Sequence, residues 1–302
     1  QPRSRGLGDV YKRQVYDLKG IKYNEYWGYH DGEKRNSRVK RVVEPILLLN
    51  HDWSIDDKSS LETSIGYQFG EMGNSRLDYA GGANPSPAYY QDLPSYFLAD
   101  TDGPDYEGAY IAQENFINNG QINWNRIYDA NLTNNQANLN AAYVLYEDRV
   151  DDTQLTFNSA YNREINENIK VTASANYRNL VSDNFAEISD MLGGYSYSNI
   201  DSFDYLDYNL LSPNSIVSEG DKFKYHYKMN AEEMSLFSMI NFSFNKLEFY
   251  VAGDITNTTY QRDGIFENEA NAGNSAGKGD EISFDGYGIK AGICLLYTSD
   301  AA

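Results

Sequence analysis

The sequence predicts an all-β fold, namely part of a transmembrane antiparallel β-barrel with long extracellular loops. Apolar side chains alternate with polar ones along several segments, and the connections between these segments alternate between short and long. Short turns are expected at 54–59, 165–168 and 245–246. Long loops are expected at about 71–151, 181–221 and 261–281. Outer-membrane barrels have this asymmetry, with tight periplasmic turns and long outer loops.

About seven strands are expected, and the clearest is 61–70. Leu61, Ile65 and Phe69 face one side of this segment, while Glu62 and Gln68 face the other. Each strand is long enough for the roughly 9–11 tilted residues that cross a bilayer. The seven are 41–53, 61–70, 155–163, 169–178, 235–244, 247–257 and 282–293.

The side chains of these strands fit a membrane setting. Aromatic residues near strand ends are typical of the girdles at the lipid interfaces: Tyr67, Phe69, Tyr161, Tyr177, Phe242, Phe244 and Tyr287. Polar residues on the other face would line the lumen: Glu62, Gln68, Lys170, Asn176, Arg178, Glu248 and Asp254. A soluble β-sandwich shows the same alternation, but structureless loops beyond about 12–15 residues are uncommon in compact domains. The long loops therefore favour the barrel.

Both ends of the chain resemble translated sequencing adapters. The DNA segment GTGTATAAGAGACAG encodes residues 10–14, and its reverse complement encodes residues 294–298. We therefore expect 1–14 and 294–302 to be non-native tails and 15–293 to be the genuine segment. The single cysteine, Cys294, falls in the second tail.

Composition excludes several classes of protein. The net charge is −19, and it becomes more negative without the tails, so a basic nucleic-acid footprint is not expected. The 27 Tyr, 13 Phe and 3 Trp argue against a disordered chain. No apolar run approaches the roughly 18 residues of a spanning helix, which excludes a helical membrane protein.

Several stretches carry a family resemblance. They read YWGYHDGEKRNSRV (26–39), VKRVVEPILLLNHDW (39–53), NSRLDYAGGANPSP (74–87), YYQDLPSY (89–96), GQINWNRIYDANLTNN (120–135), AAYVLYEDR (141–149) and NFAEI (184–188). As a set they resemble the barrel region of TonB-dependent outer-membrane receptors of Bacteroidetes, particularly flavobacterial ones. The resemblance covers essentially all of 15–293.

This resemblance implies a barrel of about 22 strands filled by an N-terminal plug. The present segment would be part of the barrel wall in the cell outer membrane, without the plug domain and without the segment that contacts the TonB complex. Its implied partners are outer-membrane lipid, its own plug, the TonB complex through regions outside this segment, and a surface lipoprotein. The implied function is energised uptake of a scarce ligand of the glycan, peptide or siderophore class.

Catalytic chemistry is not indicated, so we expect no enzyme and no cofactor. His30, His51 and His226 are far apart in sequence and have no metal-like spacing. Asp100, Asp102 and Asp105 have oxygen-rich spacing around a glycine, which makes them a candidate Ca²⁺ loop, but the full loop pattern is absent. The alternative for these residues is an ordinary turn.

Loop aromatics are the candidate ligand-binding residues. Flat rings beside amide and carboxylate groups suit sugars and other polar organic ligands, although such rings can equally pack the loops together. The candidates are Tyr26, Trp27, Tyr29, Tyr89, Tyr90, Tyr96, Trp124 and Tyr128. The alternative function is a secreted or cell-surface β-rich protein that binds glycans or mediates adhesion.

Overall fold

The computed structural model describes residues 3–99 and 103–295. Within these residues, strands form one nine-stranded sheet and two small two-stranded sheets. The chain divides into two compact units. Unit 1 comprises Gln1–Lys40, Gly73–Asp148 and Ala186–Lys224. Unit 2 comprises Arg41–Met72, Arg149–Phe185 and Tyr225–Ala302.

The large sheet has the strand order β12-β11-β10-β7-β6-β5-β3, with β13 also paired to β11 and β4 also paired to β5. Its strands are β3 (Lys40–Val43), β4 (Ile46–Asp56), β5 (Ser59–Tyr79), β6 (Tyr143–Asn166), β7 (Ile169–Asp190), β10 (Lys222–Phe244), β11 (Leu247–Gly264), β12 (Gly277–Lys278) and β13 (Ile282–Leu295). Six of the seven predicted strands each lie within one of these elements, whereas the first, 41–53, is divided between β3 and β4.

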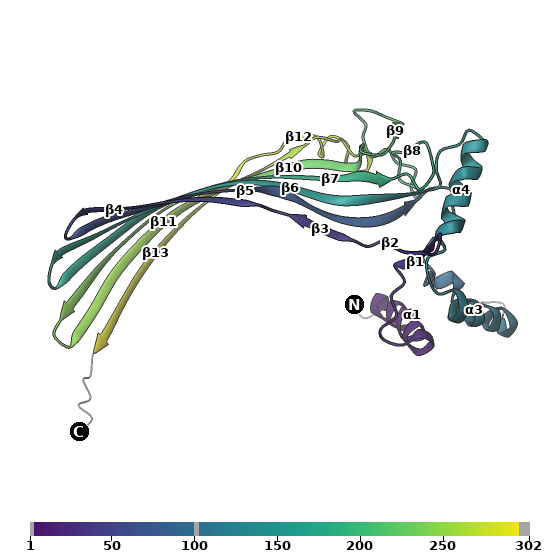
Figure 1. The fold of residues 1–302 in the computed structure, drawn as a ribbon, viewed down its shortest axis with the longest axis horizontal. Coiled ribbons are helices and arrows are strands. Elements are labelled where there is room, and N and C mark those ends of the chain that lie inside the picture. Colours follow the sequence, from purple (N-terminus) through teal and green to yellow (C-terminus); the bar gives the residue numbers. More distant parts are fainter. Residues whose placement is uncertain (1–2, 100–102, 296–302) are drawn as a thin grey trace, which may run out of the picture. The chain divides into compact units, whose positions relative to one another are not determined.

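The three predicted short turns are also confirmed, and they gather at one end of unit 2 (Figure 1). Asn245 occupies the left-handed region (φ 51), as the two-residue turns of β-hairpins require. In the other two turns, Asp56 and Asn166 accept hydrogen bonds from the backbone two residues ahead. Because the strands are antiparallel, the three long connections leave unit 2 at the opposite end.

One face of the sheet in unit 2 carries mostly apolar side chains, which lie in rows across neighbouring strands. The cross-strand register of β10, β11 and β13 places five consecutive rows on this face. We call them the apolar rows: Phe244/Leu247/Leu295, Phe242/Phe249/Ile293, Ile240/Val251/Ala291, Ser238/Gly253/Ile289 and Leu236/Ile255/Tyr287. On β4 and β5 the same face carries Leu47/Tyr67, Leu49/Ile65 and Trp53/Leu61. These side chains are exposed, for example Leu49 at 65% and Ile255 at 58%.

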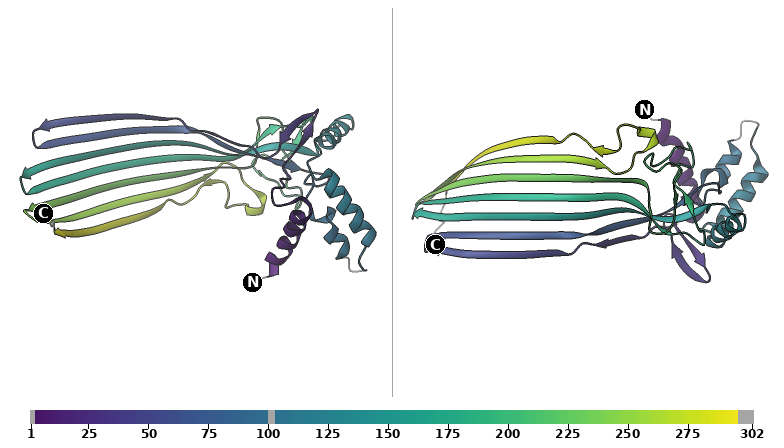
Figure 2. Two further views of the ribbon diagram at one scale, coloured as in Figure 1. Left: turned by 60° about the horizontal axis from the view of Figure 1, so that its bottom comes forward. Right: turned by 90° about the horizontal axis from the view of Figure 1, so that it is seen from above.

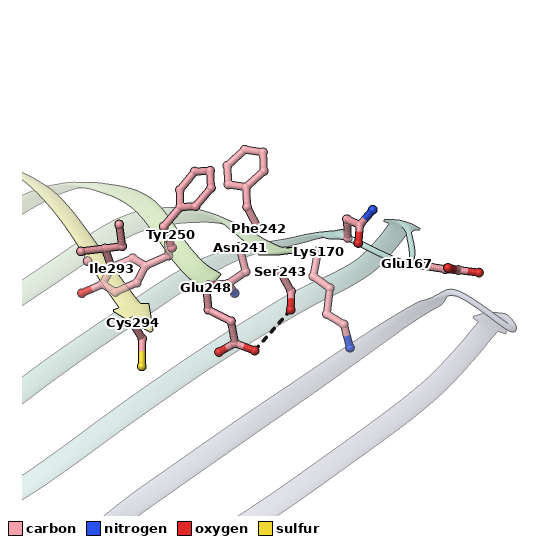
Figure 3. A pocket seen from close by; sticks show the side chains of 12 residues that line it. Glu167, Lys170, Asn241, Phe242, Ser243, Glu248, Tyr250, Ile293 and Cys294 are labelled. Carbon is pink, nitrogen blue, oxygen red and sulfur yellow. Dashed lines mark hydrogen bonds between the residues drawn. The ribbon is translucent and has the colours of Figure 1, made fainter. Parts of the chain in front are cut away.

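The opposite face of unit 2 is mixed. Glu248, Asp254 and Thr256 lie there, as the alternation predicts, and Figure 3 shows Phe242 pointing to one side of the sheet while Ser243 and Glu248 point to the other. The register also places Phe237 and Tyr250 on this second face, so it is less uniformly polar than expected.

The strands are longer than predicted, and the loops are correspondingly shorter. β5 extends to Tyr79 and β6 begins at Tyr143, so the first long connection is 80–142 rather than 71–151. The other two long connections are 191–221 and 265–281. The prediction missed these extensions because they lack regular apolar alternation, whereas a β-ladder needs only backbone hydrogen bonds.

The first long connection also contains helices that the prediction did not include. They are η1 (Tyr90–Asp92), α2 (Pro94–Leu98), α3 (Tyr106–Asn119) and α4 (Trp124–Gln136). Asp105 and Asn123 cap α3 and α4 by accepting hydrogen bonds from Gly108 and Arg126. These capping residues were the available sequence signal.

The remaining elements of unit 1 are α1 (Arg3–Lys19), β1 (Trp27–His30), β2 (Glu33–Asn36), β8 (Tyr197–Ser198) and β9 (Ile216–Val217). α1 spans the predicted end of the adapter tail at Gln14. None of the helices in the described ranges has the length and apolar character needed to cross a membrane.

The sheet is open in the described part of the chain: β4 is paired only to β5, and β13 only to β11. Figure 2 shows β4 and β13 at the two margins of the row of strands in unit 2. The mostly β character of the fold is as predicted, while closure into a barrel stays a prediction.

Asn131 connects α4 to the strands and loops of unit 1. Its side chain is fully buried. The Oδ1 atom accepts hydrogen bonds from the backbone of Ala142 (2.9 Å) and Tyr143 (3.0 Å). The Nδ2 atom donates toward the carbonyls of Tyr143, Met191 and Leu192 at 2.8–3.1 Å. One amide therefore satisfies buried backbone groups from two separate segments.

We predict that Asn131→Ala destabilises unit 1 by about 3 kcal/mol, because it leaves several buried backbone groups without a partner. Amide hydrogen exchange at Ala142 and Tyr143 should then accelerate roughly a hundredfold. Asn118→Ala on the exposed surface of α3 is the matched control and should leave both amides unchanged. Unchanged exchange in Asn131→Ala would contradict this role.

Candidate ligand-binding site

All eight predicted ligand-binding aromatics lie in unit 1, where they form two groups. Tyr26, Tyr89 and Tyr90 line an open groove, with Tyr96 packed edge-on against Tyr90 at 5.9 Å. Trp27, Tyr29, Trp124 and Tyr128 belong to the β1–β2 hairpin and to α4. The structure thus brings three candidates to the lining of one groove, packs Tyr96 against one of them and places four elsewhere.

The groove has a volume of about 570 Å³, and six of its thirteen lining residues are tyrosines. The ring centroids of Tyr89 and Tyr90 are 4.9 Å apart, and the ring planes are inclined to each other by 67°. The two rings therefore differ in orientation. Asn84 shapes this segment locally, because its Oδ1 accepts a hydrogen bond from the backbone of Ser86 (2.9 Å). Pro94 then begins α2 shortly afterwards.

Polar groups lie beside these rings. The carboxylate of Glu25 accepts a hydrogen bond from the Ser86 hydroxyl at 2.6 Å. The guanidinium of Arg38 lies over the Tyr26 ring at 4.5 Å. Burial, and then the Glu25 carboxylate, raise the pKa of Tyr26, so its hydroxyl remains a neutral hydrogen-bond donor. Aromatic faces next to donors and acceptors suit a polar organic ligand with apolar faces.

Helix α1 supplies one wall of this groove. Tyr11, Val15 and Tyr16 line it, and the Tyr11 ring lies 5.6 Å from Tyr90. Val15 also packs in a small core with Leu93 and Phe116. Tyr11 lies within the predicted adapter tail, whereas the remaining tyrosines of the groove belong to the genuine segment.

The second group consists mainly of packed rings. Trp124 is fully buried, and its indole nitrogen donates to the carbonyl of Arg35 at 3.0 Å. Tyr128 stacks on His30 at 4.2 Å, and its hydroxyl accepts from Arg35 at 2.6 Å. Tyr29 remains 56% exposed, while Trp27 packs against it and against Lys34. For Trp124 and Tyr128 the geometry supports packing of the loops rather than open ligand contact.

A half-buried polar network in unit 1 was missed by the sequence analysis. The Lys224 ammonium lies 2.9 Å from Asp78 and 4.4 Å from the Tyr146 ring. The Tyr197 hydroxyl donates to Asp78 at 3.0 Å. The backbone of Lys224 is in the left-handed region (φ 60), which is uncommon for a residue other than glycine. No local sequence pattern indicates this network, because its members are far apart in the chain.

The candidate Ca²⁺ loop falls partly outside the described residues, which do not include Asp100 and Asp102. Asp105 caps helix α3. Across residues 3–99 and 103–295, no group of three or more His, Cys, Asp or Glu is arranged to hold a metal ion. Of the three histidines, His30 stacks on Tyr128, His51 faces Thr63 across β4 and β5, and His226 contacts Asp183 at 2.8 Å.

A separate hollow of about 650 Å³ lies in unit 2 beside the short turns (Figure 3). Lys170, Ser243 and Glu248 are among its lining residues. The Ser243 hydroxyl donates to Glu248 at 3.3 Å. Because this hollow also includes Cys294, part of its lining falls in the predicted second tail.

We predict that unit 1 loses stability as the pH rises above about 10, the ordinary tyrosine pKa. Burial, and then the Asp78 carboxylate, raise the pKa of Tyr197, so the folded state favours the neutral phenol. Neutral Tyr197 stabilises the folded state fully at pH values below the tyrosine pKa of the unfolded chain. This stabilisation is lost as the pH rises from that value toward the higher pKa of Tyr197 in the folded chain. Near-UV circular dichroism across this pH range measures the loss.

The Tyr197→Phe variant should show a shallower alkaline decline, with a loss of about 1 kcal/mol at neutral pH from the missing hydrogen bond. Tyr205→Phe is the matched control in the same connection, because Tyr205 is 81% exposed. Identical alkaline profiles for Tyr197→Phe and the unmodified chain would refute this assignment.

Comparison of the chain with protein-family models and with curated proteins finds no match.

Proposed function

We propose that this chain is a segment of a TonB-dependent outer-membrane receptor. In this proposal unit 2 is part of the barrel wall in the cell outer membrane, and the full receptor takes up a scarce ligand of the glycan, peptide or siderophore class. The observation that carries the proposal is the exposed apolar face of unit 2. Large contiguous apolar surfaces on soluble monomers are rare and mark an interaction surface.

The length of the apolar rows along the strands can be compared with the height of the lipid-facing band of a barrel. On β11 they run from Leu247 to Ile255, which is about 27 Å along a strand. The next row, Met234/Asn257/Asp285, is already partly polar. A strand tilt of about 35–45° reduces this length to a band roughly 19–22 Å tall, a little below the roughly 25 Å expected in outer-membrane barrels. The apolar face is therefore close in height to the lipid-facing band of such barrels, which supports the proposal.

In strand β5 the apolar face also ends at a change to charged side chains. Its apolar side chains on this face run from Leu61 to Phe69, and Glu71 follows two residues later. Glu71 pairs with Arg41 and with Arg149, whose side chain is only 8% exposed. A change from apolar to paired charged residues at this level is expected where the hydrocarbon region ends.

The proposed activity is transport without chemical change in the ligand, so the protein is not an enzyme in this proposal. Polar residues of the second face, including Glu248 and Asp254, would line the lumen and meet the plug. The connections that leave unit 2 opposite the short turns would be extracellular, and the tyrosine groove of unit 1 would meet the ligand there. Energy would come from the TonB complex through regions outside this segment.

The alternative is a secreted or cell-surface β-rich protein that binds glycans through the same groove. Fractionation of cells that express the full chain separates the two functions. A receptor segment is recovered with the outer membrane and requires detergent for release, with mobility on gels that changes on heating. Release as a soluble monomer without detergent would exclude the receptor proposal.

We predict that Val251→Arg weakens membrane insertion by about 2–4 kcal/mol, because Val251 lies in the middle apolar row. Thr259→Arg on the same face of β11, beyond the apolar rows, should cost at most about 1 kcal/mol. Refolding into lipid vesicles with urea titration measures both values. Equal effects of the two substitutions would argue for a soluble protein.

We also predict that Tyr26→Ala weakens ligand binding about tenfold, since it removes one aromatic face from the groove. Panels of neutral oligosaccharides, peptides and ferric siderophores are the probes, and calorimetry with the full chain measures affinity. Tyr29→Ala is the matched control, because Tyr29 is exposed but does not line the groove. Equal loss in both variants would remove the groove as the site.

A further inference from the structure

A pair of rings outside the lining of the tyrosine groove connects it to a second long connection of unit 1. Asn84, which lines the groove, donates a hydrogen bond from Nδ2 to the Tyr79 hydroxyl at 3.1 Å. The Tyr79 ring in turn lies 6.3 Å from the Phe203 ring, edge to face at 81°. Phe203 belongs to the connection 191–221, which is far from the groove residues in sequence. Side-chain contacts therefore continue from the groove to this connection.

The connection 191–221 exposes two rings on a turn that is fixed by hydrogen bonds. Phe203 is 74% exposed and Tyr205 is 81% exposed. The Asp201 carboxylate accepts hydrogen bonds from the backbone of Phe203 at 2.8 Å and of Asp204 at 3.0 Å. The backbone of Tyr205 donates to the Asp201 carbonyl at 3.0 Å and lies in the left-handed region (φ 58). Bulky residues rarely adopt this conformation, and such strain occurs preferentially at functional sites.

The chemistry of the groove and of this turn suits a neutral sugar chain. The exposed carboxylate of Asp204 lies between the two ring-bearing residues in sequence, and Glu25 and Asn84 lie beside the rings of the groove. Sugars have apolar faces that pack on aromatic rings and hydroxyl groups that donate to carboxylate and amide oxygens. The one cation in the groove lining, Lys12, belongs to the predicted adapter tail. Anionic ligands would be repelled by the carboxylates of Glu25 and Asp204.

We propose that the rings of Phe203 and Tyr205 form a second subsite for the ligand of the tyrosine groove, and that this ligand is a neutral oligosaccharide long enough to reach both. The inference rests on the proposed function, because it takes the groove as the place where the ligand is met. One end of the sugar chain packs on Tyr26 in the groove, and the units that follow pass Tyr79. The other end packs on the exposed turn. Because two linked contacts hold one ligand, affinity depends on its length.

The experiment is isothermal titration calorimetry of the full chain in detergent with linear gluco-, manno- and xylo-oligosaccharides. In at least one series the longest members should bind roughly a hundredfold more tightly than the disaccharide, because only they reach both subsites. Phe203→Ala should weaken binding of these long members about tenfold and leave the disaccharide unchanged. Phe203→Tyr keeps the ring and should bind like the unmodified chain.

Tyr195→Ala is the matched control, since Tyr195 is similarly exposed in the same connection but lies before the Asp201 turn. It should leave the whole length series unchanged. Affinity that does not depend on length, or unchanged binding of the long members in Phe203→Ala, would overturn the second subsite alone. Absence of binding by every oligosaccharide would overturn the sugar assignment. Release of the chain as a soluble monomer without detergent would instead overturn the proposed function, whatever the length series shows.

Discussion

The antiparallel backbone ladder of unit 2 is the interaction on which the other features depend. Each pairing places two residues directly opposite each other, so the register determines which side chains share a face. A shift of one residue between β10 and β11 would move Val251 and Ile255 to the other face and bring Glu248 and Asp254 among the apolar side chains. The apolar rows and the polar boundary row Met234/Asn257/Asp285 both exist only in this register.

The same ladder explains why the strands continue past the apolar rows. Backbone hydrogen bonds need no particular side chain, so β11 extends through Thr259 to Gly264 after its apolar alternation has ended. Beyond the apolar rows, charged side chains are tolerated when they are paired, as Arg149 is with Glu71 and Asp151. The two parts of each strand therefore differ in side-chain chemistry but not in backbone structure.

Unit 1 is held together by different means. Its connections contain few long strand pairs, and buried or half-buried polar side chains join segments that are distant in sequence. Asn131 satisfies backbone groups of 142–143 and 191–192, and Lys224 joins β10 to Asp78 of β5. Several rings that resemble ligand contacts, above all Trp124, stabilise this arrangement by packing. The tyrosines around the groove keep accessible surface because they border open space rather than the core.

The sequence by itself determined six of the seven predicted strands as single elements, the three short turns and the alternation of faces, because a period of two and turn-forming residues are local properties. It did not reveal the helices at 106–119 and 124–136, although Asp105 and Asn123 are local capping signals. Tertiary structure alone decided which aromatic residues border a groove and which are buried, because burial of Tyr26 or Trp124 depends on segments far away in the chain. It also decided that Asn257 and Asp285 face each other in the polar boundary row, since this requires a register between strands that alternation within one strand cannot specify.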